Sequence, residues 1–533
     1  AIIRLHPAAS GRTLGMLYFT NSIGAALGVL LSGFVLIELV GLPGTSLTAG
    51  IINILLASGV WLLSKNPVFT GEPPAIEPAA RDRGISRILV LVAALTGAAS
   101  FFYEIGWIRM LSLVLSSSTQ AFELMLSAFI AGLAMGSYFI RNRIDRIRSP
   151  GVYLAWIQVI MGLLAVATLP LYVESFSWMS FLFSGLSKTL EGYALFNFSS
   201  QFIALLIMFP ATFMAGMTLP LLSNTLLKAG GRESAIGVIY SANTLGSILG
   251  VVLAIHVVMP LLGVKSLIIV GSFIDIALGI VLLRRFSDRA WSRLQLAALS
   301  VVLFAMVLFS LTPFDKAVLS SGVYRFGKAS LDAGDSLSFY RDGKTSSTAL
   351  VHHADGSISI RTNGKVDANI APYDRDYSAD EITMVMAAMV PLAMNPEARS
   401  IANIGLGSGL TSHAFLASST IKTLDTIEIE YSMVEAARGF GKRVERVFSD
   451  PRSVIHIDDA KSFFSSHRKE YDIIVSEPSN PWISGVSSLF TREFYDHVKT
   501  NLSQDGLFIQ WLQLYEIDIT NVASVMSALS ESF

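Results

Sequence analysis

Two long apolar runs constrain this sequence more than any other feature. Residues 294–311 contain no charged residue, and residues 267–283 contain only Asp275. A helix needs about 20 mostly apolar residues to cross the hydrocarbon core of a bilayer, and buried helices of soluble proteins are rarely so long and so apolar. The sequence therefore predicts membrane-spanning helices.

Similar runs fill the first 312 residues. Only 15% of the 533 residues are charged, whereas soluble chains usually carry about 25%. The deficit is confined to this part, because residues 313–533 have an ordinary soluble composition. We predict a polytopic α-helical membrane domain over 1–312 with about nine spans, at 14–38, 45–63, 88–113, 119–140, 152–173, 199–227, 234–258, 264–284 and 293–312.

An internal repeat relates residues 11–63 to residues 231–283. At a constant offset of 222, Tyr18, Asn21, Gly24, Leu27, Gly28 and Gly41 recur as Tyr240, Asn243, Gly246, Leu249, Gly250 and Gly263. Duplicated helix groups are common in transporter folds. The first copy lacks upstream helices, so we expect the sequence to be a fragment that is cut at both ends.

Ionisable residues inside spans are costly and are expected to face the interior of the bundle. Five residues qualify here: Glu104, Arg109, Glu123, His256 and Asp275. Glu104 and Arg109 could form a structural ion pair or belong to a transport or ligand site, and the sequence is consistent with both.

The short loops predict the orientation. Lys and Arg gather in five clusters, near residues 4–12, 65–87, 141–148, 228–232 and 284–293, and nine spans place all five on one side. That side should be cytoplasmic. The segment after residue 312 would then lie outside the cytoplasm, unless a span is miscounted, with 88–113 the weakest.

The part after the spans has a different pattern. We expect a linker over 313–334 and a small antiparallel sheet over 335–370, with turns at Asp342-Gly343, Asp355-Gly356 and Asn363-Gly364. Over 371–533, strands at 401–405, 424–429, 453–457, 471–476 and 506–511 alternate with helices. This alternation predicts an α/β Rossmann-like domain of the methyltransferase type with a parallel sheet.

Acids and glycines follow the first three of these strands. Gly405, Gly407, Ser408 and Gly409 follow the first strand, and glycines there allow backbone N–H groups to approach a ligand. The last glycine comes one residue too early for a dinucleotide loop. Glu428 or Glu430 after the second strand can accept hydrogen bonds from ribose, and an acid in Asp458-Asp459-Ala460 can bind an adenine amino group. This order favours an adenosyl ligand.

A stiff loop follows the fourth strand. It reads Ser476-Glu477-Pro478-Ser479-Asn480-Pro481-Trp482, with two prolines and a tryptophan. Glu477 is placed to act as a base or to hold a substrate amine. A helix-capping or surface acid is the alternative interpretation.

These motifs resemble the spermidine synthase (polyamine aminopropyltransferase) family, and more closely its membrane-fused bacterial members. The resemblance covers about 335–533, and the stretches 98–142 and 211–283 resemble the membrane part of those fusions. It is carried by residues 404–411, 427–438, 476–482, 488–495 and 510–515. It implies a bacterial inner (plasma) membrane protein that transfers an aminopropyl group from decarboxylated S-adenosylmethionine to an amine such as putrescine.

The resemblance also implies roles for single residues. Glu428 would bind ribose, Asp459 with Ala460 would bind adenine, and Glu477 would deprotonate the attacking amine. We expect Tyr340, Asn480 and Tyr515 to contact the substrate. The sequence departs from the family at Ser408 and Asn480, where the family has acids, and at Met384, where it has a glutamine.

Two other functions remain open. One is a methyltransferase that uses intact S-adenosylmethionine, whose carboxylate would favour Ser408 over an acid. The other is a transporter or sensor whose soluble domain binds a nucleoside or polyamine without catalysis. The absence of cysteine excludes thiolate metal sites, and we expect no metal, no nucleic-acid partner, contact with the lipid bilayer and a possible homo-oligomer.

Overall fold

The structure is a computed structural model that describes residues 10–65, 83–187, 189–230, 234–287, 293–514 and 517–533. The chain forms two compact units. The helical unit comprises Ala1–Leu111, Gln120–Trp178 and Leu182–Pro313, and the α/β unit comprises Ser112–Thr119, Met179–Phe181 and Phe314–Phe533. Each unit is described by itself.

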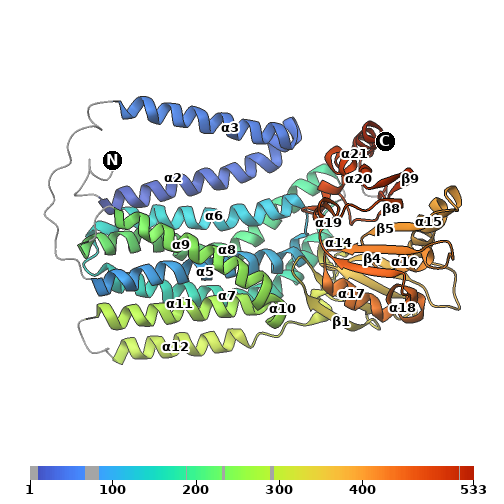
Figure 1. Cartoon of the computed structure of the whole chain (residues 1–533). Coiled ribbons are helices and arrows are strands. Elements are labelled where there is room, and N and C mark those ends of the chain that lie inside the picture. Colours follow the sequence, from blue (N-terminus) through green and yellow to red (C-terminus); the bar gives the residue numbers. More distant parts are fainter. Residues whose placement is uncertain (1–9, 66–82, 188, 231–233, 288–292, 515–516) are drawn as a thin grey trace. The chain divides into compact units, whose positions relative to one another are not determined.

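The helical unit is built from long apolar helices (Figure 1). Its α-helices are α2 (Ser10–Leu31), α3 (Ile37–Ser64), α5 (Arg83–Leu115), α6 (Thr119–Arg141), α7 (Pro150–Gly185), α8 (Leu190–Lys228), α9 (Ser234–Leu253), α10 (Met259–Leu262), α11 (Val264–Phe286) and α12 (Arg293–Ser310). Within the described residues, seven helical stretches are long and apolar enough to cross a membrane, and Gln295–Ser310 is a shorter apolar helix. Their length and composition indicate a multi-pass membrane protein.

The nine predicted spans all fall on these helices. The first two belong to one stretch, Ser10–Ser64, which the left-handed backbone of Gly41 interrupts at φ 67°. The predicted span 88–113, the weakest in the sequence, lies within the uninterrupted helix α5.

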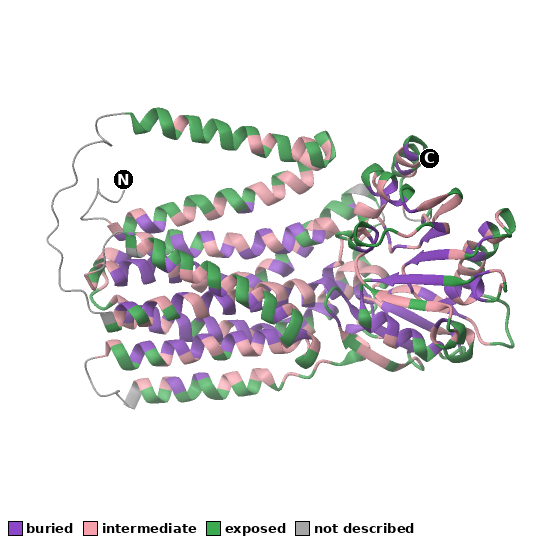
Figure 2. Cartoon of the chain, viewed as in Figure 1, coloured by how far each residue is buried: buried purple, intermediate pink, exposed green. Residues whose placement is uncertain are grey.

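An apolar core joins α5, α6, α7, α8 and α11. Leu89, Ile140, Leu154, Leu221 and Leu282 belong to it and are fully buried. Helix α3, by contrast, has no buried residue, and Figure 2 shows it as largely exposed. An exposed apolar surface of this kind suits contact with lipid.

Matched local features occur in the two segments of the predicted repeat. The π-helices η2 (Ser32–Leu36) and η4 (Ala254–Val258) stand 222 residues apart, as do the left-handed glycines Gly41 and Gly263. The rings of Tyr18 and Tyr240 stack with their centroids 5.1 Å apart. The repeat itself stays a prediction from the sequence.

A buried polar cluster links α5 to α11. The Tyr103 hydroxyl donates a hydrogen bond of 2.6 Å to Asp275 Oδ2, and Thr96 Oγ1 lies 3.4 Å from Oδ1. Asp275 is fully buried and Glu123 is nearly so. Both face protein rather than lipid, as expected for carboxyl groups inside spans.

The α/β unit begins with two short helices, α13 (Lys316–Leu319) and α14 (Val323–Phe326), inside the predicted linker. An antiparallel sheet follows in the order β1 (Ser336–Asp342), β2 (Ser347–His352), β3 (Ile358–Thr362) and β4 (Lys365–Ile370). Strand β4 lies within the predicted sheet 335–370, after the predicted turn at Asn363-Gly364, and its apolar residues Val366, Ala368 and Ile370 alternate with polar ones. Its pairing shifts, since Arg361 pairs with Val366 but Ile360 pairs with Ala368, which leaves Asp367 in a bulge.

The second sheet has five parallel strands in the order β7-β6-β5-β8-β9. They are β5 (Ser400–Ile404), β6 (Thr423–Glu428), β7 (Ser453–Ile457), β8 (Tyr471–Ser476) and β9 (Leu502–Gln510), with the helices α15 (Ala379–Met394), α16 (Leu410–Phe415), α17 (Tyr431–Ala437), α18 (Glu445–Ser449), α19 (Ala460–Ser466), α20 (Arg492–Lys499) and α21 (Ile519–Ser532). Buried apolar residues from strands and helices form its cores. This architecture confirms the predicted fold class.

The loop between α5 and α6 is also part of the α/β unit. Ser118 pairs with Ile483 in an isolated β-bridge, and the backbone N–H of Ser484 donates to Ser117 O at 3.0 Å. The Asn363 side chain donates to Ser117 Oγ at 2.9 Å. This loop therefore holds the segment that follows residues 476–482.

Candidate active site

The candidate site lies where the strand order of the parallel sheet reverses. The chain moves outward from β5 through β6 to β7, then returns to the other side of β5 as β8 and β9. Loops at such a switch point diverge and leave a crevice at the carboxyl ends of the strands. The loops after β5 and β8 start side by side, because the Glu477 N–H donates to Ile404 O at 2.9 Å.

The glycine loop after β5 depends on left-handed backbone. Gly405, Gly407 and Gly409 have φ values of 91°, 53° and 88°. A side chain at Gly405 would stand 2.6 Å from the Glu477 carbonyl oxygen, so only glycine fits there. A side chain at Gly407 would meet no atom within 4 Å, which leaves its backbone open to a ligand.

Glu428 ends β6 and fastens the glycine loop. Its Oε2 accepts the Leu406 N–H at 3.0 Å and its Oε1 accepts the Glu430 N–H at 2.9 Å. Burial raises the pKa of Glu428 to about 7, although these two hydrogen bonds oppose the rise. Each carboxylate oxygen can accept one further bond, so both stay available to hydroxyl donors.

Glu430, the other candidate for the ribose acid, is engaged elsewhere. Its Oε2 accepts hydrogen bonds from the Thr345 N–H at 2.8 Å and the Thr345 hydroxyl at 2.9 Å. Its Oε1 accepts the Ser432 N–H. Glu430 thus ties the β1–β2 turn to α17, and Glu428 remains the candidate for ribose.

Asp459 and Ala460 begin α19. Asp459 is the N-cap of this helix, and its Oδ2 accepts the Ser462 N–H at 3.1 Å. Capping uses one oxygen of the carboxylate, so the other could accept an amino group. The structural role of Asp459 is therefore compatible with the predicted contact to adenine.

Glu477 opens the loop after β8. The residue is only partly buried, but its Oε1 is shielded from solvent and has no hydrogen-bond partner. Its Oε2 lies 3.0 Å from Thr411 Oγ1, which also lies 3.0 Å from the Met384 carbonyl oxygen. Burial raises the pKa of Glu477 to about 7, against the effect of the Thr411 hydrogen bond.

The Thr411 contacts explain how Glu477 can exist in two protonation states. A hydroxyl has one proton to donate. When Thr411 donates to the Met384 carbonyl, its oxygen can accept a hydrogen bond from the O–H of neutral Glu477. When Thr411 turns toward Glu477, it stabilises the carboxylate.

Asn480 lies three residues further along the same loop. Its side chain is fully buried, yet neither the amide oxygen nor the amide nitrogen has a hydrogen-bond partner. A buried amide without partners is costly unless a ligand supplies them. Asn480 is thus the strongest indication of a polar ligand beside Glu477.

Two departures from the family pattern contact each other. Ser408 is fully buried, and its hydroxyl lies 3.2 Å from Met384 Sδ. The acid and the glutamine that the family would place here are thus replaced together by a less polar pair.

The remaining predicted substrate residues are less informative. The Tyr340 hydroxyl, on β1, donates to Asp342 Oδ1 at 3.1 Å. Tyr515 lies outside the described residues.

Sequence reasoning missed a buried ion pair at the start of β4. Lys365 Nζ lies 2.9 Å from Asp367 Oδ1 and 3.1 Å from Ser479 Oγ, in the loop that carries Glu477. Burial is the main cause of the raised pKa of Glu428, and the charge of Asp367 adds to it. The sequence feature that could have indicated this pair is a Lys and an Asp two residues apart, directly after the turn Asn363-Gly364.

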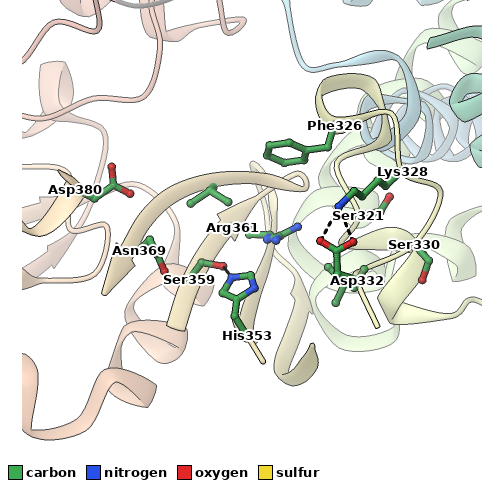
Figure 3. A pocket seen from close by; sticks show the side chains of 12 residues that line it. Ser321, Phe326, Lys328, Ser330, Asp332, His353, Ser359, Arg361, Asn369 and Asp380 are labelled. Carbon is green, nitrogen blue, oxygen red and sulfur yellow. Dashed lines mark hydrogen bonds and ion pairs between the residues drawn. The ribbon is translucent and has the colours of Figure 1, made fainter. Parts of the chain in front are cut away.

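A separate hollow of about 450 Å³ lies beside the small sheet (Figure 3). Arg361, His353 and Asn369 line it from the sheet, and the Lys328–Asp332 ion pair lines it from the segment before the sheet. None of the predicted site residues lines this hollow. Among the described residues, no group of three or more His, Asp or Glu side chains is arranged to hold a metal ion.

The strand order and the loops define a Rossmann-like domain of the methyltransferase type. Residues 381–533 match the family model described as spermine/spermidine synthase domain. The C-terminal part of this chain therefore contains a domain of that family.

Curated relatives match over the same part. A polyamine aminopropyltransferase of Clostridium perfringens is 32% identical over 124 residues, which are 23% of this chain and 44% of the relative. One from Thermotoga petrophila is 30% identical over 142 residues, 25% of this chain and 48% of the relative. The chain thus spans less than half the length of these relatives.

Solved structures match this chain at lower identity. A spermidine synthase in complex with the transition state analogue AdoDATO is 22% identical, with a TM-score of 0.33 and coverage of 37% of this chain and 65% of that chain. The spermidine synthase from Thermotoga maritima is also 22% identical, with a TM-score of 0.32 and coverage of 37% and 64%.

Proposed function

We propose that the C-terminal domain is a membrane-anchored aminopropyltransferase that uses decarboxylated S-adenosylmethionine as its co-substrate. The observation that carries the proposal is Glu477, a carboxyl group with a shielded, unpartnered oxygen and a pKa of about 7 at the switch point of the sheet. A general base works best when its pKa lies near the operating pH.

The reaction is a displacement at carbon. The lone pair of a neutral amine attacks the aminopropyl carbon that is bonded to the sulfonium, and a carbon–nitrogen bond forms. The carbon–sulfur bond breaks with its electron pair passing to sulfur, which leaves neutral methylthioadenosine. The amine proton passes to Glu477, so the product is a lengthened amine.

Other residues would hold the reactants in line. Glu428 would accept the ribose hydroxyls, the free oxygen of Asp459 would accept the adenine amino group, and the backbone at Gly407 would lie against the nucleoside. The buried amide of Asn480 would bind the substrate beside Glu477. Such positioning converts an encounter in solution into a step within one complex.

A methyltransferase is the second candidate, because Ser408 replaces an acid that would repel the carboxylate of intact S-adenosylmethionine. Product analysis separates the two. Full-length protein is incubated with each adenosyl compound and a panel of primary amines, and the nucleoside products are identified by mass spectrometry. Aminopropyl transfer yields methylthioadenosine from the decarboxylated compound. S-adenosylhomocysteine from the intact compound alone would overturn the proposal in favour of methyl transfer.

A further inference from the structure

The hollow beside the small sheet contains a buried guanidinium group. Arg361, on β3, is only 8% exposed, and its Nη1 donates to the Ser320 carbonyl oxygen at 2.9 Å. Its Nε is shielded from solvent and has no hydrogen-bond partner among the residues that the structure describes. A buried N–H group without a partner is costly unless a ligand accepts its hydrogen bond. Figure 3 shows Arg361 among the side chains that line the hollow.

Within the described part of the chain, no carboxylate forms an ion pair with Arg361. No Asp or Glu oxygen described there lies within 4.0 Å of its guanidinium nitrogens. Asp332 contacts Lys328 at 2.6 Å and Asp335 contacts His353 at 2.8 Å, so each acid has a basic partner of its own. Burial lowers the pKa of Arg361, and the charges of the two acids oppose this shift at longer range. A ligand carboxylate would supply the direct partner that this buried cation lacks.

A second polar group without a partner lines the same hollow. Ser321 is 3% exposed, and its hydroxyl oxygen is shielded and has no hydrogen-bond partner in the described segments. Ser321 directly follows Ser320, whose carbonyl oxygen accepts from Arg361, so the hydroxyl and the guanidinium lie at the same end of the hollow. A hydroxyl and a guanidinium can both donate to one carboxylate group.

The rest of the lining limits the kind of ligand. Asp332 and Asp380 also line the hollow and would repel a second negative charge. Phe326 and Leu331 supply apolar surface, and the Asn369 amide oxygen, which is shielded without a partner among the described groups, can accept a hydrogen bond. The volume of about 450 Å³ is in the usual range for small-molecule sites. The lining therefore suits a small organic monoanion.

We propose that this hollow binds a small organic monocarboxylate, whose carboxylate group accepts hydrogen bonds from the Arg361 guanidinium and the Ser321 hydroxyl. All residues that line the hollow belong to the α/β unit. Glu428 and Glu477 are not among them, so this second site is separate from the proposed transferase site. The carboxylate would bind here whether or not the domain transfers aminopropyl groups.

Isothermal titration calorimetry of full-length protein in detergent tests the proposal with butyrate as the probe. Butyramide has nearly the same shape without the charge, and inorganic phosphate at pH 8 carries a second charge. The wild type should bind butyrate about tenfold or more tightly than butyramide, because donors to a charged group are stronger, and should also prefer butyrate to phosphate. No binding of butyrate, equal affinity for butyramide or a preference for phosphate would overturn the proposal.

Variants then assign the binding to the hollow. Arg361→Gln should weaken butyrate binding by about tenfold or more, and Arg361→Lys, which retains the charge, should weaken it less. Arg468→Gln, the matched control, removes an exposed guanidinium outside the hollow and should bind butyrate like the wild type.

Circular dichroism establishes that each variant is folded. If Arg361→Gln does not fold, Ser321→Ala takes its place, because it removes a single hydroxyl that has no partner among the described residues. Ser321→Ala should weaken butyrate binding by about threefold or more. Unchanged butyrate affinity in folded Arg361→Gln, or in Ser321→Ala where that variant is needed, would overturn the proposal.

Discussion

Burial in the folded domain sets the protonation of two carboxyl groups at the candidate site, those of Glu428 and Glu477. Glu428 and Glu477 both have pKa values raised to about 7 by burial, but their surroundings differ. Glu428 has backbone donors on both oxygens, whereas Glu477 has one oxygen without a partner. The first arrangement suits a ligand-binding acid and the second suits a group that exchanges a proton.

The raised pKa of Glu477 predicts a pH-dependent effect on stability. A carboxyl group whose pKa is higher in the folded protein contributes stability that is fully present below its unfolded pKa of about 4.3 and is lost as pH rises through about 7. Glu477→Gln should therefore stabilise the protein by about 1–3 kcal/mol at pH 8 and by much less at pH 5. Thermal unfolding of full-length protein at both pH values measures this. An equal effect at both would contradict the assignment.

Glu428 should matter for the nucleoside. Glutamine retains the shape of the side chain but has one acceptor oxygen instead of two, so Glu428→Gln should weaken methylthioadenosine binding by about 1.5–3 kcal/mol, the range for bonds to charged groups. Calorimetry measures the affinity. The exposed Glu445→Gln serves as a matched control and should bind normally. Equal affinity for both folded variants would remove Glu428 from the site.

The glycines and acids after the strands could be found in the sequence because strand ends meet at one edge of a parallel sheet. The residues that contact these loops from distant parts of the chain could not be found in the sequence. Lys365 and Ser479 are more than a hundred residues apart, and only the folded β4 brings them together. From the sequence, Glu430 and Glu428 were equivalent candidates for the ribose acid. The structure distinguishes them, because Glu430 is hydrogen-bonded to Thr345 in the β1–β2 turn.

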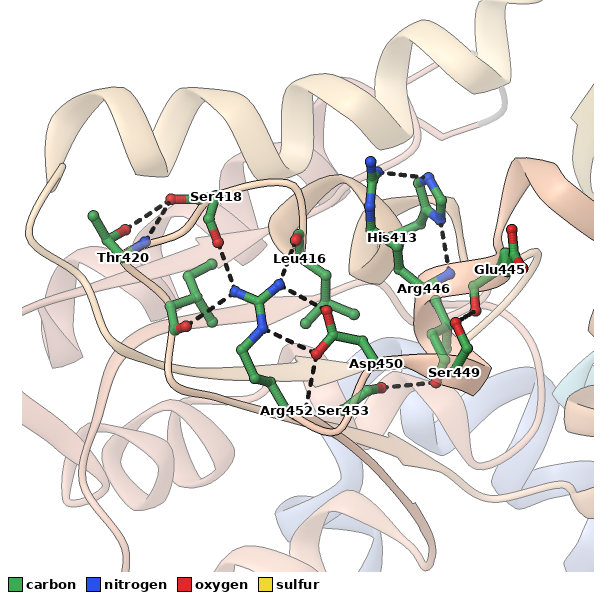
Figure 4. Close-up of polar contacts among 12 residues, drawn as sticks. His413, Leu416, Ser418, Thr420, Glu445, Arg446, Ser449, Asp450, Arg452 and Ser453 are labelled. Atoms are coloured by element: carbon green, nitrogen blue, oxygen red, sulfur yellow. Dashed lines mark hydrogen bonds and ion pairs between the residues drawn. The ribbon is translucent and has the colours of Figure 1, made fainter.

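At the scale of elements, a guanidinium clamp fixes the periphery of the parallel sheet (Figure 4). Arg452 donates to both oxygens of Asp450, at 2.9 Å and 2.7 Å, and to the carbonyl oxygens of Leu416, Ser418 and Ile421. The Arg452 hydrogen bonds hold the pKa of Asp450 at about 2. The clamp joins the end of α16 to the turn before β7.

Arg452→Lys should destabilise the α/β unit. A lysine ammonium cannot reach Asp450 and three carbonyl groups at once, so some of these acceptors lose their partner. We expect a loss of about 1–3 kcal/mol, measured by chemical denaturation of full-length protein. The exposed Arg468→Lys makes the same change outside the clamp and should have no effect. Equal stability of the two variants would show that the clamp contributes nothing.

Elements with regular periodicity were predictable, but the irregular pairing of β4 was not. The strands β5, β7 and β8 have continuous apolar or alternating patterns, and their predicted ranges lie within a residue of those observed. Strand β4 keeps the alternation of polar and apolar residues, so its sequence gives no sign of the bulge that leaves Asp367 unpaired.

For the whole molecule, the order of the helices and of the α/β segments along the chain bears on which side of the membrane the α/β unit lies. The α/β unit includes Ser112–Thr119, Met179–Phe181 and Phe314–Phe533, which lie at or beyond the ends of α5, α7 and α12. The Arg-rich segments near 141–148 and 284–293 lie at the other ends of α7 and α12. The distribution of basic residues therefore predicts that the α/β unit lies outside the cytoplasm.

Cysteine labelling tests this orientation in a chain without native cysteine. Single cysteines replace Asn142 and Ser287, next to the basic segments, and Ser524, exposed on α21. An impermeant thiol reagent applied to intact cells should label Ser524→Cys and spare the other two. The reverse pattern would place the α/β unit in the cytoplasm, and labelling of all three after permeabilisation confirms that each site is reactive.

The measurement that bears most directly on the proposed chemistry is the rate of methylthioadenosine release by Glu477→Gln. Glutamine cannot take the proton from the attacking amine but preserves the shape of the side chain. We expect the variant to bind methylthioadenosine like the wild type and to lose about 10²–10⁴ in rate, the usual contribution of a positioned base. The exposed Glu470→Gln, just before β8, should keep full activity. Equal rates for Glu477→Gln and the wild type would contradict the role of Glu477 as the base.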